Sequence, residues 1–592
     1  MPRIVRVDAG RLGRSATSRK LGIVQDASVV AGSEGRSPAK LLIEELDDAL
    51  TASSSEAYLC CVNRGILDDS LIYAIESNQV QSRQLLEAIT RAVSLAPDAP
   101  SCWPLEGFAS IAVWPMDAES LLVKTDDAGP PPASLLLDQV IAEERWLAPG
   151  TCPAGIKCPF CNSRATLARS GPREALLQIL RWYELGSGKR WSFRDLFSLV
   201  SYLLAGHRLP EQEHHSEPCH WAARLMELDA QAVEGARPTK QKSSAIFLLA
   251  TASYEHALFH RWEKGIASSL LKDVKDLALE QDHTLMGLYY FIQGRKSPYL
   301  PATIAALLEG VVDLLDPAMA NPDIEIPVSA RSNVVLRELD ARFSRSIEEG
   351  IEFVRKYQFL SVVELDLLRR IAKVDTGLTA SPTRRKKPAA ASRVQQTLRD
   401  YACRLVRRSL GARSAVVLDA DILEAFQKVV QDDDDSGDLL YEVARGVEEL
   451  LNKGEYFEVS LTTTFGQPLP PPNRQATLIV PRRGVRMREA KPIGRPSSPL
   501  CFLQVGSGHS EQPIALTYDL FKAIKELERG MSVASLPRSV VALLDTTKAR
   551  LSGPIVRDEE VLLRAKIRMG TSGIAIAKHR GAFVSRKEGT KI

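Results

Sequence analysis

Cysteine provides the clearest candidate site for chemistry in this chain. The segment TCPAGIKCPFC places Cys152, Cys158 and Cys161 within ten residues, and the last two form a Cys-x-x-Cys pair. Cys219 or His220, in the segment HHSEPCHWA, can supply a fourth ligand after two intervening helices. Tetrahedral zinc needs four such ligands, and a Cys-x-x-Cys turn offers two thiolates at a suitable separation. The sequence therefore predicts a zinc site made of Cys152, Cys158, Cys161 and Cys219.

Two other interpretations of these cysteines stay open from the sequence alone. The spacing Cys-x5-Cys-x2-Cys differs from that of common zinc fingers, so buried free thiols in a helical domain are the alternative. A thioredoxin-like redox pair has less support, because no βαβ unit is expected around the motif.

The histidines give little evidence of a metal site. His256 and His260 share one face of an expected helix but lack the His-Glu-x-x-His form, which favours a packed or surface pair.

Polar residues follow two expected strands near the N-terminus. Asp26 follows the apolar run Gly22–Gln25, while Asn63 and Arg64 follow the run Tyr58–Val62. An acid at the carboxyl end of a strand can present its carboxylate to Mg²⁺ beside a nucleotide, as in a Walker B element. The next strand end is where AAA+ ATPases place a polar sensor for the attacking water, and an arginine there can reach a γ-phosphate. Taken alone, an aspartate in this position is also a common turn residue.

The chain contains no G-x-x-x-x-G-K-[ST] motif to cradle phosphates. Its one Gly-Lys pair, at 188–189, is not followed by Ser or Thr, and Tyr183 stands where the first glycine would be. The segment lies between two expected helices and not after a strand. A helix C-cap at Gly186 or Gly188, followed by a helix N-cap at Ser192, is the favoured interpretation.

Three strings resemble the part of large P-loop, AAA+-like ATPases that follows Walker B: CVNRGIL at 61–67, VWPMDAESLL at 113–122 and SGKRWSFRDLFSLVSYLL at 187–204. The ATPases in question belong to bacterial anti-phage defence systems, in particular to phosphorothioation-dependent DNA restriction, and the resemblance covers about residues 1–260. It implies ATP and Mg²⁺ as cofactors and other subunits of a defence complex as partners. It also implies four catalytic roles: Asp26 for Walker B, Asn63 for the sensor, Arg64 for a candidate finger and Arg194 for the arginine of a helical lid.

The resemblance departs from its family at the N-terminus. Walker A stands well upstream of Walker B in such ATPases, whereas only 25 residues precede Asp26 here. Either the chain begins downstream of the true start, or it is an ATPase-derived subunit that cannot cradle phosphates by itself. We therefore expect the isolated chain to hydrolyse ATP slowly or not at all.

Basic residues gather at two places in the last part of the chain. The C-terminal residues 564–591 are rich in Lys and Arg. A denser cluster has four arginines in seven residues, with Glu489 as the one acid nearby: Arg482, Arg483, Arg486 and Arg488. Such clusters neutralise phosphates and give salt-dependent binding, so DNA is a candidate partner. A solvated face with a cationic tail is the alternative.

The order of the expected elements divides the first part of the chain into three domains. Residues 1–125 alternate strands and helices and predict a partial AAA+-like α/β domain with a parallel sheet, in which Phe108–Trp114 is one strand. Residues 134–240 predict a helical, lid-like domain with the cysteine cluster, and residues 241–375 predict a second helical domain. The expected helices include Glu174–Leu185, Phe193–Ala205, Ala245–Leu258 and Val335–Phe359.

Two further parts follow. Residues 376–393 contain a run of Arg and Lys beside Pro388 and predict a flexible basic linker. Residues 394–592 predict an α+β domain with basic patches, in which Gly437–Leu451 is a helix and proline-rich turns separate the strands. The predicted fold class is thus an α/β N-terminal region, a mainly helical middle and an α+β C-terminal domain.

Composition limits the class of protein. The chain has 592 residues, of which 45% are hydrophobic and 25% charged, as in globular proteins. Its apolar runs fall far short of the roughly 20 residues that span a bilayer, and its N-terminus lacks a signal-peptide stretch, so a cytoplasmic location without membrane contact is expected. Nine unevenly spread cysteines argue against a disulfide scaffold. A net charge of +3 means that any nucleic-acid contact depends on local patches.

These features predict an ATPase-type subunit of a bacterial defence system against foreign DNA, catalytically incomplete because it has no P-loop. The alternative is a non-catalytic, zinc-containing scaffold or DNA-binding subunit of a multiprotein complex. Whether the chain is itself an enzyme stays open at this point, and an oligomer is compatible with either interpretation.

Overall fold

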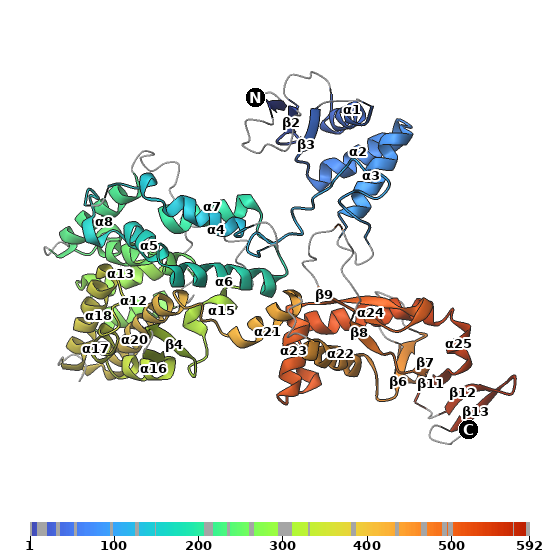
Figure 1. The fold of residues 1–592 in the computed structure, drawn as a ribbon. Helices are drawn as coiled ribbons and strands as arrows, with labels where there is room; N and C mark the ends of the chain where they lie inside the picture. Colours follow the sequence, from blue (N-terminus) through green and yellow to red (C-terminus); the bar gives the residue numbers. More distant parts are fainter. Residues whose placement is uncertain are drawn as a thin grey trace. The chain divides into compact units, whose positions relative to one another are not determined.

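The computed structural model of the chain forms two compact units (Figure 1): residues 1–119 with 487–502, and residues 120–486 with 503–592. It describes residues 3–587 apart from 9–19, 31–35, 52–55, 95–98, 125–128, 149, 207–216, 234–236, 260–265, 294–310, 330–331, 381–385, 432–436, 463–469, 488–493, 495–500 and 572–573.

In its described residues, the first unit combines a small sheet with three helices. The sheet has the order β1-β2-β3, made of β1 (Ile4–Asp8), β2 (Lys20–Val24) and β3 (Glu56–Cys60). The helices are α1 (Pro38–Thr51), α2 (Arg64–Glu76) and α3 (Val80–Ala92), which pack against one another. Their apolar stripes supply the buried core, including Leu42, Leu85 and Leu86.

The sheet of the first unit is mixed, which corrects the prediction of an AAA+-like parallel sheet. β2 runs parallel to β3, but β1 runs antiparallel to β2. Phe108–Trp114, predicted as a strand, consists of turns and irregular structure with isolated bridges. Gly107 has a φ of 82°, a conformation that interrupts extended backbone just before this run.

A second segment of the chain completes the first unit. The backbone N–H groups of Cys102 and Trp103 donate to the carbonyl of Gly494 at 2.8 and 3.1 Å. Gly494 has a φ of 76°, and a Cβ there would lie 2.4 Å from Ser101 Oγ. Glycine is therefore required where the two segments meet.

The second unit begins with a helical part. Its helices are α4 (Pro132–Ile141), α5 (Pro159–Leu167), α6 (Ser170–Ser187), α7 (Phe193–Ala205), α8 (Pro218–Val233), α9 (Lys240–Ser243), α10 (Ala245–Thr251), α11 (Tyr254–Ala257), α12 (Ile266–Asp276), α13 (His283–Gln293), α15 (Val312–Leu315), α16 (Leu336–Arg345), α17 (Ile347–Arg355), α18 (Val362–Ala380) and α20 (Pro388–Ala412). One hairpin, β4 (Glu325–Ser329) and β5 (Ser332–Val335), interrupts them. A single core cluster runs from Ala154 to Val416, so the two predicted helical domains share one core.

The stretch predicted as a linker over 376–393 is mostly helical in its described residues, 376–380 and 386–393. α18 extends to Ala380 and α20 begins at Pro388, where proline is favourable because the first helical N–H needs no partner. α20 packs against α12, α16 and α18, and its buried residues recur at helical spacing. The predicted boundary at 393–394 thus falls inside α20, because buried residues recur at helical spacing on both sides of it, from Ala390 and Ala391 to Val394 and Leu398.

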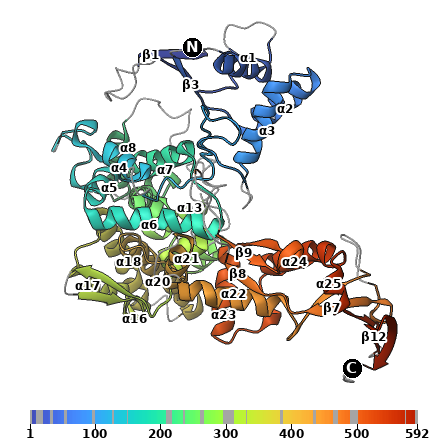
Figure 2. The same cartoon turned by 45° about the vertical axis from the view of Figure 1, so that its right-hand side comes forward.

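The remainder of the second unit mixes helices and strands, as the α+β prediction expects. Its helices are α21 (Ala420–Gln431), α22 (Gly437–Leu451), α23 (Tyr518–Glu528), α24 (Arg538–Ile555) and α25 (Glu559–Leu563). Its strands are β6 (Tyr456–Ser460), β7 (Ala476–Pro481), β8 (Val485–Met487), β9 (Cys501–Val505), β10 (Gln512–Leu516), β11 (Lys566–Met569), β12 (Ile574–His579) and β13 (Ala582–Lys587). They form the sheets β13-β12-β11-β7-β6 and β10-β9-β8, and α22, α23 and α24 pack beside them (Figure 2).

Candidate metal centre

The four cysteines of the predicted zinc site come from two segments of the second unit. Cys158 immediately precedes α5 and Cys161 lies in its first turn, with a proline at the first helical position. Cys152 lies in the loop before a single 3-10 turn at 155–157, where Gly155 has a φ of 54°. Cys219 lies in the first turn of α8. The tight loop and the two helix starts bring short side chains toward a common point.

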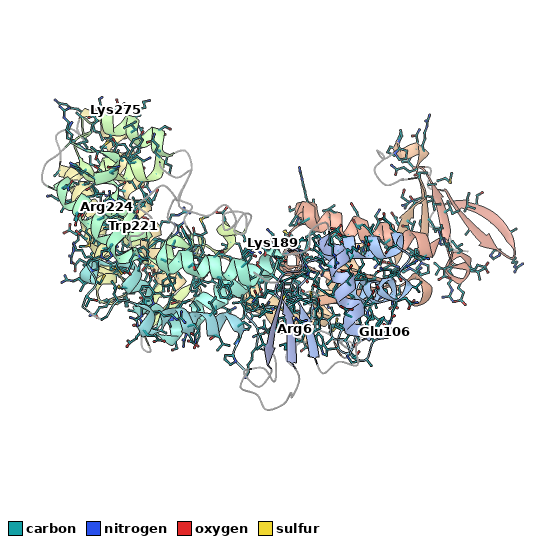
Figure 3. All side chains as sticks on the ribbon, turned by 90° about the horizontal axis from the view of Figure 1, so that it is seen from above. Arg6, Glu106, Lys189, Trp221, Arg224 and Lys275 are labelled. Carbon is teal, nitrogen blue, oxygen red and sulfur yellow. The ribbon has the colours of Figure 1, made fainter. Side chains whose placement is uncertain are left out.

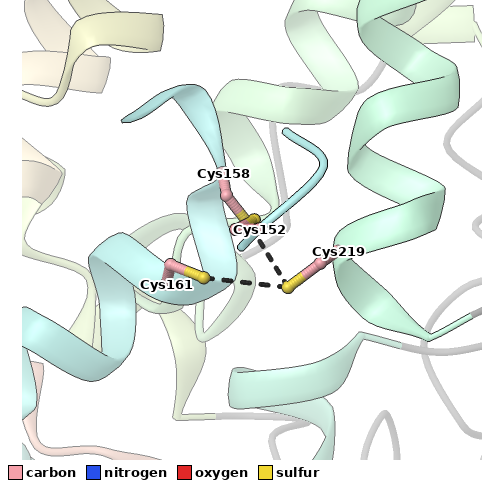
Figure 4. Close-up of side chains that lie close together, drawn as sticks. All are labelled: Cys152, Cys158, Cys161 and Cys219. Carbon is pink, nitrogen blue, oxygen red and sulfur yellow. Dashed lines mark hydrogen bonds between the residues drawn. The ribbon is translucent and has the colours of Figure 1, made fainter. Parts of the chain in front are cut away.

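The structure brings all four predicted cysteines together (Figure 4). Their Sγ atoms lie within 4.8 Å of one another, and Cys219 Sγ lies 3.7 Å from the Sγ atoms of both Cys158 and Cys161. Disulfide sulfurs are about 2.05 Å apart, so these thiols are not bonded to each other. His220, the alternative fourth ligand, is exposed and not part of the group.

The spacing of the sulfur atoms suits a tetrahedral metal ion. Zinc–thiolate bonds of about 2.3 Å put two ligands of a tetrahedron about 3.8 Å apart, close to the separations seen here. Cys158 and Cys219 are 1% and 4% exposed, while Cys152 and Cys161 are half-buried. Thiolates are soft ligands that favour zinc over magnesium or calcium. The four residues could therefore hold a metal such as zinc.

The cysteine thiols of the cluster shift one another's pKa values in opposite directions. The hydrogen bond from the Cys158 thiol lowers the pKa of Cys161 to about 6, and the positive charge of Arg164 acts in the same direction. That hydrogen bond, together with burial, raises the pKa of Cys158, and burial raises the pKa of Cys219 to about 12. Cys161 is therefore the first of these three to become a thiolate, and a metal ion must displace the remaining protons when it binds.

Ion pairs connect both segments that supply the cysteines, residues 152–161 and α8, to α18. Lys157, at the end of the 3-10 turn, lies 3.3 Å from Asp366 of α18. Arg370 of α18 donates to Asp366 and also binds Asp229 of α8 through two bonds of 2.6 and 2.8 Å. Asp229 lies on the same helix as Cys219. A metal ion bound by the four cysteines would connect α5 directly to α8, two helices that these ion pairs already connect through α18.

α8 also packs on α5 through the side chain of Trp221. Trp221 lies two residues after Cys219, and its ring centroid is 5.8 Å from that of Phe160 in α5. Arg224, on the next turn of α8, is exposed (Figure 3). The aromatic contact therefore supports the approach of the two helices next to the cysteines.

Buried charged side chains lie next to this region, and sequence reasoning missed them. Ser163 Oγ of α5 accepts a hydrogen bond of 3.1 Å from the first backbone N–H of α11. In α11, His256 Nε2 lies 2.7 Å from Glu364 Oε1, and both side chains are fully buried. Arg413 forms an ion pair of 2.5 Å with Glu255. Burial alone would raise the pKa of Glu364, but the hydrogen bond from His256 and the charges of His256 and Arg413 hold it at about 2.

Of the histidine pair predicted to be packed or at the surface, the structure describes only His256. His256 is packed in the core, whereas His260 lies outside the described residues. Glu364 is 108 residues away from His256, so no local pattern in the sequence could have pointed to it.

Asp26 and Asn63 reach one edge of the small sheet, where the segments after β2 and β3 share a backbone hydrogen bond of 3.0 Å. The Asp26 carboxylate accepts hydrogen bonds from the backbone N–H and the hydroxyl of Ser28, at 2.9 and 2.6 Å. The Asn63 side chain caps α2 by accepting from Ile66 N–H at 2.9 Å. Both residues therefore have local structural roles at this edge.

The two arginines that the resemblance assigns to catalysis lie in different units. Arg64 pairs with Asp117 at 2.7 Å and donates to the carbonyl of Val93 at 2.9 Å. Arg194 is exposed in the first turn of α7, in the second unit. Arg64 thus ties the start of α2 to two loops of its own unit.

The segment around the Gly-Lys pair has the predicted capping structure. Gly188 ends α6 with a φ of 67°, and Ser192 caps α7 by accepting from Asp195 N–H at 3.1 Å. Lys189 is exposed in the loop between the two helices (Figure 3). This confirms the interpretation of the segment as a helix end followed by a helix start.

Two of the four arginines predicted to contact DNA, Arg482 and Arg486, have carboxylate partners from distant parts of the chain. Arg482 lies 2.5 Å from Glu448 of α22, and Arg486 pairs with Glu511. Arg488 lies outside the described residues. These partners are 34 and 25 residues away, which is why the local sequence did not reveal them.

Arg483, the remaining arginine of the cluster, is 7% exposed. Its backbone N–H and C=O both bind the Asn452 side chain at 2.9 Å. Burial lowers the pKa of Arg483, although Asp558 partly offsets this effect. Its side chain is therefore placed for packing more than for contact with a phosphate backbone.

No family model, curated protein or solved structure matches this chain. Within the described ranges, no helix has the length and apolar character that crossing a membrane requires.

Proposed function

We propose that this chain is a non-catalytic scaffold subunit whose helical part is held together by one structural zinc ion. The observation that carries the proposal is the group of four Sγ atoms within 4.8 Å of one another. Four protein thiolates would fill all positions of a tetrahedral zinc and leave none for water or substrate, as in structural centres and unlike catalytic ones. Cys152, Cys158, Cys161 and Cys219 would supply the ligands.

The zinc would fix the start of α8 to the segment 152–161. A contact between α8 and α18 already exists through Arg370 and Asp229, and Lys157 joins the other side of the site to α18. Since structural zinc contributes folding free energy directly, the metal would set the position of α8 within the shared core.

Elemental analysis of the full chain, purified without chelator, tests this proposal. We expect one zinc per chain, lost in Cys158→Ser because a buried ligand is removed. Cys403→Ser is the matched control: Cys403 is a half-buried cysteine of the same unit that donates to Asp340, and serine can keep that bond. Zinc-free wild type, or zinc retained by Cys158→Ser, would contradict the proposal.

A second candidate is an ATPase-type subunit of a bacterial defence complex against foreign DNA. One observation favours it: β2 and β3 are parallel, and Asp26 and Asn63 follow them at the same edge. The hydrogen bonds of both side chains to nearby backbone argue for local roles instead. Robust turnover of Mg-ATP by the full chain, abolished by Asp26→Asn, would favour this candidate, whereas negligible turnover by wild type would favour the scaffold.

Contact with DNA through Arg482, Arg483, Arg486 and Arg488 belongs to this second candidate. A phosphate would have to compete with Glu448 for Arg482 and with Glu511 for Arg486. Replacing all four by alanine tests the idea: weaker binding across all DNA sequences with a flatter salt dependence would support it, and unchanged binding at low salt would refute it.

A further inference from the structure

The first unit contains a groove of about 280 Å³ between the start of α1 and one face of α2. Its lining combines apolar and acidic side chains, namely Pro38, Ile66, Ile72, Tyr73, Asp69 and Glu76. Ser70 donates to the Ile66 carbonyl at 2.6 Å and lies 3.5 Å from the Ala39 carbonyl, so α2 and the start of α1 are held together below the groove.

α2 carries apolar residues on two faces; its own unit buries one of them and covers part of the other, where Tyr73 packs against the core. The buried face consists of Leu67, Ser70 and Ala74. The groove face follows the spacing i, i+3, i+4 and i+7, with Asp69, Ile72, Tyr73 and Glu76 in one stripe. Ile72 is 54% exposed, and Ile75, three residues along, is 49% exposed. A helix that is apolar on both faces normally has a covering layer on each.

The two acids of the stripe have no cationic partner among the described residues. Asp69 and Glu76 are both exposed, one helical turn on either side of the apolar pair. Of the cations close in sequence to the lining, Arg36 pairs with Glu44 and Arg64 pairs with Asp117, and Lys40, next to the lining residue Ala39, forms no ion pair with either acid. In the described part of the chain, the groove therefore presents an apolar centre flanked by two carboxylates without an ion-pair partner.

The size of the groove narrows the kind of occupant. Its volume of about 280 Å³ has room for a few inserted side chains of a peptide. A helix that places aliphatic side chains in such a groove is a common form of recognition. Lysine or arginine beside those side chains would complement the two flanking carboxylates.

We propose that the α1/α2 groove docks a basic amphipathic segment of a partner protein. Aliphatic side chains of that segment contact Ile72 and Tyr73, and its lysines or arginines pair with Asp69 and Glu76. This inference rests on the proposed scaffold function and names the class of partner that the scaffold receives. The groove lies in the first unit and the cysteine cluster in the second, so each can be tested without the other.

A labelled helical peptide of leucine and lysine, titrated into the full chain, tests the groove. We expect fluorescence anisotropy to show binding of this peptide and no binding of a leucine/glutamate peptide with the same apolar face. The double variant Asp69→Lys/Glu76→Lys should weaken binding at least about tenfold, because attraction becomes repulsion. Ile72→Gln should weaken binding without changing charge.

The matched control is Asp48→Lys/Glu106→Lys. Both residues are exposed acids of the same unit outside the groove lining, and the change in net charge is the same (Glu106 is labelled in Figure 3). The control should bind like wild type, and circular dichroism should show that every variant is folded.

Three outcomes of the binding measurements would overturn the inference, and a fourth comes from the oligomeric state. The three are failure of the wild type to bind the leucine/lysine peptide, equal binding of the two peptides, and equal affinity of the groove and control variants. A concentration-dependent dimer that the groove variants abolish would assign this face to a second copy of the chain, and would also overturn it. The zinc content of the same samples reports on the proposed function separately.

Discussion

At the scale of single residues, short-range hydrogen bonds account for the polar side chains after β2 and β3. Asn63 satisfies one of the free N–H groups at the start of α2, and Asp26 closes a turn through Ser28. Such roles depend on the side-chain oxygen and not on a bound nucleotide. Substitution of either residue should therefore change the local stability of the fold, whereas substitution of a catalytic residue would change an activity.

Asn63→Ala should destabilise α2 by about 1 kcal/mol, because the helix loses its N-cap. Asn63→Asp should cost little, since aspartate also caps well. Hydrogen exchange of α2 peptides in full-length protein measures both effects. Protection in Asn63→Ala equal to that in wild type would show that the cap does not stabilise this helix.

Glu364→Gln should change how stability depends on pH. The pKa of Glu364 is held at about 2, below its usual 4.5, so its carboxylate stabilises the fold above pH 4.5 and loses this effect between pH 4.5 and 2. We expect the variant to be less stable than wild type by about 3 kcal/mol at neutral pH, and the difference to shrink below pH 4.5.

Thermal unfolding across this pH range measures the difference. Glu352→Gln is the control, because the ion pair of Glu352 with Arg355 is exposed and should contribute less than about 1 kcal/mol. A stability difference for Glu364→Gln that stays constant from neutral pH to pH 3 would argue against the depressed pKa.

At the scale of elements, helices with a strong apolar period could be predicted and their interruptions could not. The predicted helices Phe193–Ala205 and Gly437–Leu451 agree with α7 and α22. The predicted helix Val335–Phe359 is instead two helices, α16 and α17, because Ser346 leaves the helical conformation and caps α17. A serine in a periodic run gives no sign of this until its neighbours are packed.

The candidate metal site could be predicted because three of its ligands are local. Cys152, Cys158 and Cys161 share one short segment, and Cys219 was the nearest suitable cysteine beyond it. The ion pairs around the site could not be predicted, because Asp229 and Arg370 are 141 residues apart and ordinary in their local context. The same reason explains the missed partners of the arginines at 482 and 486.

Arg370→Ala should weaken the connection between α8 and α18. Arg370 binds Asp229, whose side chain is 11% exposed, so its loss leaves a mostly buried carboxylate without this partner. We expect a loss of about 2 kcal/mol in unfolding free energy, less than for a fully buried pair. Urea denaturation of the full chain measures it.

Arg337→Ala is the matched control for this substitution. The ion pair of Arg337 with Asp323 is exposed, with side chains 68% and 64% accessible, and its removal should cost less than about 1 kcal/mol. Equal losses for the two variants would mean that Arg370 adds nothing beyond a surface ion pair.

At the scale of the whole molecule, the second unit has to hold a long helical part together. Its core draws residues from Ala154 to Val416, and the cysteine cluster joins two of the first elements that contribute to it. Metal, ion pairs and an aromatic contact would then hold α8 in place together. The metal is the component that can be removed and restored without changing the sequence.

The most direct test is thermal unfolding of the full chain before and after zinc is removed with a chelator. We expect the chelated protein to melt at a clearly lower temperature, and stoichiometric Zn²⁺, but not Mg²⁺, to restore the original transition, because bound metal stabilises the native state. Cys158→Ser should already melt at the lower temperature and not respond to chelator, while Cys403→Ser should respond like wild type. A wild-type protein that melts at the same temperature with and without zinc would contradict a structural metal centre.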